Sequence, residues 1–171
     1  METKDVIEGR RCIRKFKDKR ISDKQLDELI DAMILAPSAG NMQSRKFYIV
    51  RNKEIKEKLA EAAHSQGFIA QVPVAIVICT DSSISTRYGK RGEIIYSLLD
   101  CGASIQNLLL RAYDMGLGGC WVGAFDEERV REILGIPSNL RPVSIIPIGH
   151  PDESPSMPQR KSKKECCEFV D

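Results

Sequence analysis

The chain has 171 residues, 42% of them hydrophobic and 29% charged, with a net charge of +2 at neutral pH. This composition is that of an ordinary globular protein, and the length suits a single domain over residues 1–171. No apolar run approaches the roughly 20 residues of a membrane-spanning helix, and the polar N-terminus has no signal-peptide core. We therefore expect a soluble, cytoplasmic protein with no membrane partner.

The first expected element is a helix over residues 22–36. Ser22 and Gln25 form a capping box, apolar residues follow at helical spacing, and Pro37 ends the pattern. A short strand and a second helix are expected next, at 47–50 and 53–63.

The apolar run 73–80 predicts a central strand buried on both faces. The pattern over 94–115 predicts a long helix that is apolar nearly all round, so it is buried in the core or in a subunit interface. The remaining expected elements are a strand at 117–122, a helix from Asp126 to Leu134 and a strand at 143–149.

This order is not a regular βαβ alternation, so it predicts an α+β fold rather than a doubly wound sheet. The tail 151–171 is rich in proline, serine and charge, and it either crosses to another subunit or frays. Fingerprints of P-loop, dinucleotide-binding and nucleophile-elbow proteins are absent from the sequence.

The six cysteines and two histidines form no metal-binding pattern. No two cysteines are spaced as CxxC, and His64 and His150 lie far apart in sequence, so we expect no metal site. Most of the cysteines sit in apolar runs, as reduced thiols do. Cys166 and Cys167 are expected to be an incidental surface pair, because adjacent cysteines form only strained disulfides.

Positive charge is concentrated in residues 10–20, which hold seven basic side chains and one acidic one. Their net charge of +6 leaves −4 for the rest of the chain. The cluster predicts either an anionic ligand or only a solvated basic surface. Nucleic acid is disfavoured as the partner, because Phe16 is the segment's one aromatic residue and no nucleic-acid-binding motif accompanies it.

Three segments carry residues suited to a ligand. In an extended segment 10–16, Arg10, Cys12 and Arg14 would point the same way, and arginine forks suit phosphate. The loop 36–43 has small residues that let a ligand approach its backbone, and the segment 116–125 is expected to be a strand that ends in a glycine-bearing turn.

Together these segments resemble the nitroreductase family of FMN enzymes, which carries the motifs RRS-x-R-x-F, APS-x-x-N-x-Q and GLG-x-x-W-x-G-x-F and a late Arg/Lys pair. The matches run in the same order over nearly the whole chain. The resemblance implies a mainly antiparallel sheet flanked by helices, in an intertwined homodimer with FMN at its interface. It also implies an NAD(P)H-dependent oxidoreductase that reduces nitroaromatics, quinones or similar acceptors by a ping-pong mechanism. A dehalogenase-like or flavin-consuming enzyme is the alternative within the family.

The resemblance further implies which residues bind FMN. They are Arg10, Arg11, Cys12 and Arg14; Pro37, Ser38, Ala39, Asn41 and Gln43; Trp121, Val122 and Gly123; and Arg160 and Lys161. The basic residues would hold the phosphate and the pyrimidine edge, and the loop would reach the isoalloxazine partly from the second subunit. Cys12 stands where serine is usual, and a thiol is a weaker donor. We expect no side chain to be catalytic, because the flavin carries the hydride chemistry.

Structural roles remain open alternatives for several of these residues. Arg11 would then face solvent, Asn41 would satisfy a turn and Trp121 would pack in the core. The polar segment 81–93 is expected near the substrate entrance, and its shortness predicts an open site.

Overall fold

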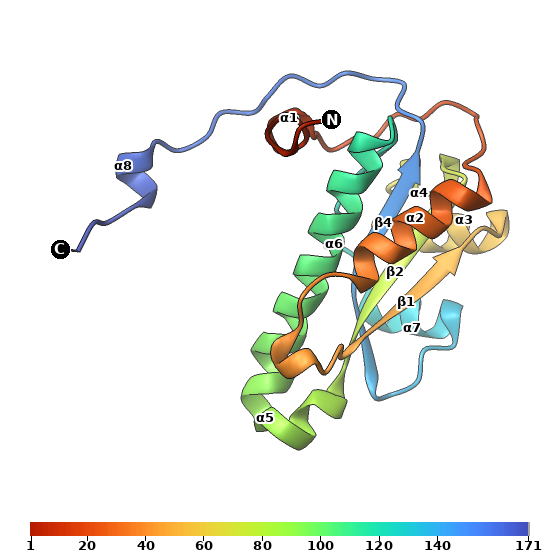
Figure 1. The fold of residues 1–171 in the computed structure, drawn as a ribbon. Coiled ribbons are helices and arrows are strands. Elements are labelled where there is room, and N and C mark those ends of the chain that lie inside the picture. Colours follow the sequence, from red (N-terminus) through yellow and green to blue (C-terminus); the bar gives the residue numbers. More distant parts are fainter. Residues whose placement is uncertain (171) are drawn as a thin grey trace.

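The structure, a computed structural model, describes residues 1–170 as a twisted sheet between two layers of helices (Figure 1). The sheet has the strand order β1–β2–β4–β3, and every neighbouring pair is antiparallel. The strands are β1 Arg45–Val50, β2 Val74–Asp81, β3 Gly118–Gly119 and β4 Leu140–Gly149. The predicted α+β class and mainly antiparallel sheet are confirmed.

Strand β2 divides the core into two halves. Because successive side chains of a strand point to opposite faces, Ala75 and Val77 join one buried cluster and Ile76 and Ile78 join the other. All four side chains are fully buried, as expected for a central strand covered on both sides.

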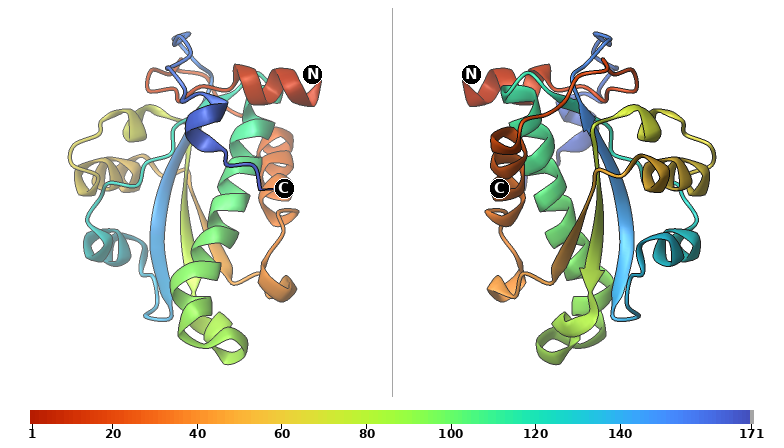
Figure 2. Two further views of the ribbon diagram at one scale, coloured as in Figure 1. Left: turned by 90° about the vertical axis from the view of Figure 1, so that its left-hand side faces the viewer. Right: turned by 90° about the vertical axis from the view of Figure 1, so that its right-hand side faces the viewer.

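Helices cover both faces of the sheet (Figure 2). Helices α2 and α6 pack on the face of Ile76 and Ile78, whereas α3, α4 and α7 lie on the other face. Their bounds are α2 Asp23–Ile34, α3 Lys53–Ala62, α4 Phe68–Gln71, α6 Ser97–Asp114 and α7 Glu127–Leu134. The predicted capping box of α2 is present, since the Ser22 hydroxyl accepts from the Gln25 N–H and the Gln25 side chain accepts from the Ser22 N–H.

Some expected bounds were wrong. The strand expected at 117–122 shrinks to β3 and an isolated bridge between Val122 and Ile145, because this glycine-rich stretch leaves the edge of the sheet. The helix expected from residue 94 begins as a π-helical turn, η3 Gly92–Tyr96. Further helical elements were not expected: α1 Thr3–Gly9, α4, η1 Ala39–Asn41, η2 Ser82–Ile84, α5 Ser85–Arg91 and α8 Lys163–Cys166.

The tail leaves β4 beside α1 and then runs away from the sheet to α8 (Figure 1). Its residues from 156 to 170 are exposed, which is consistent with the expectation that it forms no core element. No helix within residues 1–170 has the length and apolar character needed to cross a membrane.

Candidate functional site

The basic segment 10–16, called the arm below, pairs directly with the glycine-rich segment. The Ile13 N–H donates to the Gly119 carbonyl at 3.0 Å, and Cys12 forms a parallel bridge with Gly119. A Cβ on Gly118 would lie only 3.1 Å from the Cβ of Ile13, so glycine is required for this approach. Two of the three predicted segments therefore meet at the C-terminal end of α6.

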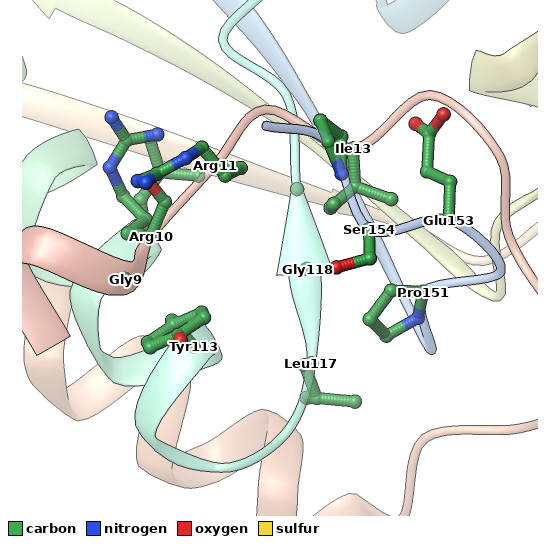
Figure 3. Close-up of a pocket in the computed structure, with 13 residues that line it drawn as sticks. Gly9, Arg10, Arg11, Ile13, Tyr113, Leu117, Gly118, Pro151, Glu153 and Ser154 are labelled. Carbon is green, nitrogen blue, oxygen red and sulfur yellow. The ribbon is translucent and has the colours of Figure 1, made fainter. Parts of the chain in front are cut away.

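A cavity of about 410 Å³ opens at this junction (Figure 3). Arg10 and Arg11 border one side and Glu153 the other, while Tyr113 of α6 lines its base. Its further lining comes from Ile13, Leu117, Gly118 and Gly119 and from tail residues Pro151 to Pro155. The cavity thus combines cationic side chains with exposed backbone.

The arginines of the arm do different work. The Arg11 guanidinium donates to the carbonyls of Glu8 and Arg10 at 2.7 and 2.8 Å, so it caps the C-terminal end of α1. Arg14 is exposed, and its backbone N–H donates to the Glu153 carboxylate, which also accepts from the Lys15 N–H at 3.0 Å. Arg10 and Arg14 are therefore the arm's better candidates for an anion.

Cys12 is half-buried at the same junction. A hydrogen bond from the Cys120 thiol, aided by the Trp121 N–H and by Arg10, lowers the pKa of Cys12 to about 5 despite its burial. The same hydrogen bond, together with burial, raises the pKa of Cys120. Its surroundings therefore favour the thiolate form of Cys12.

The loop 37–43 is held in an unusual conformation. Gly40, Asn41 and Gln43 have φ values of 54°, 56° and 52°, and left-handed backbone is costly for the two non-glycine residues. The Ser38 hydroxyl accepts from the Gln43 N–H at 3.0 Å and closes the loop. The exposed side chains of Asn41 and Gln43 remain available to a ligand.

Two residues that the sequence analysis missed hold this loop. The buried Asp100 of α6 accepts from the Ala39 N–H at 3.0 Å, and its second carboxylate oxygen is buried without a partner. Arg45 donates to three carbonyls, those of Ile34, Ala36 and Pro37. The one available signal was a carboxylate inside an otherwise apolar helix pattern.

In one chain the arm and the loop lie at opposite ends of α6 (Figure 1). Tyr113 borders the cavity and Asp100 holds the loop. These residues are 13 positions apart on the helix, or about 20 Å at about 1.5 Å per residue. One subunit therefore does not bring all the predicted residues together.

The remaining predicted FMN-binding residues lie on the glycine-rich segment and on the tail. Trp121 is 42% exposed, and its Nε1 donates to the Ser144 hydroxyl at 2.7 Å, so it is not an ordinary core residue. Val122 is buried in the core, which leaves only its backbone for a ligand. Gly123 is exposed, and Arg160 and Lys161 are exposed on the tail, beyond the residues that line the cavity.

An apolar surface lies next to the loop. The residues just before the loop, the π-helical turn η3 and the first turn of α6 expose large hydrophobic side chains to between 37% and 80%. They are Ile34, Leu35, Ile94, Ile95, Leu98 and Leu99, and we call them the apolar patch. The long helix is therefore not fully buried within one chain. Of the two alternatives expected for 94–115, burial in the core does not account for these exposed residues, and burial in a subunit interface stays a prediction. A cluster of such residues on a surface indicates a docking face.

The polar segment expected near the substrate entrance does lie beside the loop. Helix α5 within it presents Arg87, whose guanidinium donates to the Gly40 carbonyl at 3.2 Å. Within residues 1–170, no group of three or more histidines, cysteines or acids is placed to hold a metal ion.

Known proteins resemble this chain in both sequence and fold. A profile described as "Nitroreductase family" matches residues 7–70 and 63–150. A protein of Methanothermobacter thermautotrophicus, provisionally named NADH dehydrogenase/NAD(P)H nitroreductase, is 36% identical over 91% of this chain and 80% of its own length. An FMN reductase [NAD(P)H] of Bacillus subtilis is 30% identical over 87% of this chain and 67% of its own.

A solved structure of an FMN oxidoreductase has a closely similar fold. The NADPH:FMN oxidoreductase of Vibrio harveyi, in complex with NAD⁺, superposes with a TM-score of 0.91 at 28% identity, over 99% of this chain and 77% of that one. The profile covers most of the chain, and the curated relatives match it over most of its length. The predicted resemblance is confirmed, and the chain belongs to the nitroreductase family.

Proposed function

We propose that the chain is an NAD(P)H-dependent FMN oxidoreductase that acts as a homodimer. The names of its relatives, FMN reductase and NADPH:FMN oxidoreductase, support this activity. The observation that carries the dimer is the separation of the arm from the loop along α6, with the apolar patch beside the loop. A second copy related by a two-fold axis would cover that patch and bring its loop to the arm of the first.

The arm and its cavity fit FMN. A volume of about 410 Å³ lies within the roughly 300–1,000 Å³ of small-molecule sites. Arg10 lines the cavity and Arg14 follows on the same arm, and such forks suit a terminal phosphate. In a dimer, the exposed amides of Asn41 and Gln43 would face the heterocycle, and Arg160 and Lys161 would add charge at the phosphate.

The residues of this chain would bind and orient the reactants. When bound, FMN supplies hydride transfer from NAD(P)H to nitroaromatic, quinone or similar acceptors. Trp121 would lie along the ring, and the left-handed loop would present its amides in a fixed geometry. His150 lies against the Arg20 carbonyl at 3.3 Å, outside the cavity lining, so it is not placed for a proton transfer at this cavity. With the flavin carrying the hydride, donor and acceptor would use one site in turn, with ping-pong kinetics.

Absorbance and sedimentation test this proposal together. The purified protein should be yellow, release FMN on heating and sediment as a dimer at micromolar concentration. Recovery of mainly FAD, or a stable flavin-loaded monomer, would contradict it.

A further inference from the structure

The arm carries a second chemical feature that hydride transfer does not use, a pair of thiols. Cys12 pairs with Gly119, the residue before Cys120, in a parallel bridge. Cys12 packs against the buried cluster that contains Cys120. Interaction with the Cys120 thiol is the main cause of the lowered pKa of Cys12, and the Trp121 N–H contributes.

The two sulfurs differ in accessibility and charge. Cys12 is half-buried, whereas Cys120 is only 2% exposed. Cys12 has a pKa of about 5 and is a thiolate at neutral pH, while Cys120 stays protonated. The charged groups that face the pair are Arg10 and Arg14 of the arm and Glu153 of the tail. A reagent from solution therefore meets the nucleophilic sulfur first.

The other cysteines have different environments. Cys79 and Cys101 are buried, and burial raises the pKa of each to about 12, so both are inert. Cys166 and Cys167 are exposed on the tail, far along the chain from the arm. They serve as internal controls for exposure without a buried partner thiol.

We propose that Cys12 and Cys120 form a dithiol site that hydroperoxides oxidise to an internal disulfide. The Cys12 thiolate attacks the peroxide O–O bond, which gives a sulfenic acid and expels an alkoxide, or hydroxide from hydrogen peroxide, that one proton converts to alcohol or water. The Cys120 sulfur then forms the S–S bond with Cys12 and expels hydroxide, which takes the Cys120 proton and leaves as water. Two electrons pass from the two sulfurs to one hydroperoxide.

The second step becomes easier once the first has occurred. The leading cause of the raised pKa of Cys120 is its hydrogen bond to Cys12, and the negative charge on that sulfur contributes. A sulfenic acid carries no such charge, so oxidation of Cys12 removes much of what kept the Cys120 proton in place. The disulfide would add a covalent tie beside the hydrogen bond from Ile13 to Gly119.

Peptide mapping after peroxide treatment tests the site, and it does not depend on the proposed function. The full-length protein, in a Cys166→Ser/Cys167→Ser background, is treated with one equivalent of hydrogen peroxide and then alkylated. We expect a Cys12–Cys120 linked peptide and a protein mass lower by two hydrogen atoms, both reversed by dithiothreitol. Cys12→Ser should abolish the product, and Cys120→Ala should leave a dimedone-reactive sulfenic acid on Cys12.

A second measurement is the pH dependence of alkylation. Because the pKa of Cys12 is about 5, its iodoacetamide reaction in the wild-type chain should already be at its plateau at pH 7. The proposal is overturned if peroxide gives no linked peptide, if it stops at a Cys12 sulfenic acid while Cys120 is present, or if the alkylation rate of Cys12 still rises steeply above pH 7. Each of these outcomes can occur in a fully flavin-loaded dimer, so they are distinct from failure of the flavin proposal.

Discussion

The two ends of helix α6 are built by different means. At the C-terminal end the arm is joined to the glycine-rich segment by backbone hydrogen bonds, and its cationic side chains border an open cavity. At the N-terminal end the loop 37–43 is held by side chains, those of Asp100 and Arg45, and it lies beside the apolar patch. One end offers charge and the other offers neutral amides.

Under the proposed function, each end is half of a site. The cations of the arm suit a phosphate, and the amides of the loop suit a heterocycle edge. The length of α6 keeps the two apart within one chain, so in the proposed dimer a partner chain would bring them together. The strain of the loop fits this view, because left-handed non-glycine residues persist only where the surroundings enforce them.

Breaking the apolar patch should have the largest effect. Leu98→Glu/Leu99→Glu would place two carboxylates in the proposed interface, at a cost of several kcal/mol. We expect dimer affinity to fall by at least about 100-fold, with loss of the flavin. Lys58→Glu, on an exposed position of α3, is the matched control and should sediment as the wild type does. A flavin-loaded monomer of the double variant would refute the two-halves interpretation.

The arm should respond differently at its three arginines. Arg10→Ala or Arg14→Ala removes a charge-assisted bond worth about 1.5–3 kcal/mol, which weakens FMN binding by about 10- to 150-fold. Excess FMN should restore much of the rate. Arg11→Ala removes the cap of α1 instead, so it should lower the melting temperature with less effect on FMN affinity. Equal flavin loss in all three variants, measured by fluorescence titration, would contradict this division.

The loop end should show a smaller effect through Asp100. Asp100→Ala removes the acceptor of the Ala39 N–H and should lower the free energy of unfolding by about 1–3 kcal/mol. Asp100→Asn keeps an acceptor oxygen and should recover part of that loss. Denaturant titration gives the stabilities, and the Michaelis constant for the acceptor reports on the loop. An unchanged Michaelis constant in Asp100→Ala would argue against a positioning role.

Features of the candidate site that depend on local sequence pattern could be predicted from the sequence, whereas contacts between distant residues could not. Alternation placed Arg10 and Arg14 on one extended arm. The close approach of this arm to Gly118, which the structure contains, was not predicted. Asp100 and Arg45 escaped prediction because their partners are backbone groups 61 and 8 to 11 residues away, and no local periodicity encodes such pairs. Helices α1 and α5 were missed because each is a short element, seven residues long, with few buried residues.

The smallest expected effect concerns Cys12, which lies on the arm and belongs to the proposed dithiol site. Serine is the usual residue at this position in the family, and its hydroxyl is a better hydrogen-bond donor than a thiol. Cys12→Ser should therefore keep the flavin and most of the activity, while it removes the thiolate that Cys120 stabilises. Steady-state assays of Cys12→Ser and Arg10→Ala, with and without added FMN, would distinguish a loss of flavin from a loss of chemistry. A Cys12→Ser enzyme that is fully yellow yet inactive would mean that the thiol takes part in turnover, and that the flavin and its binding residues do not suffice for the chemistry.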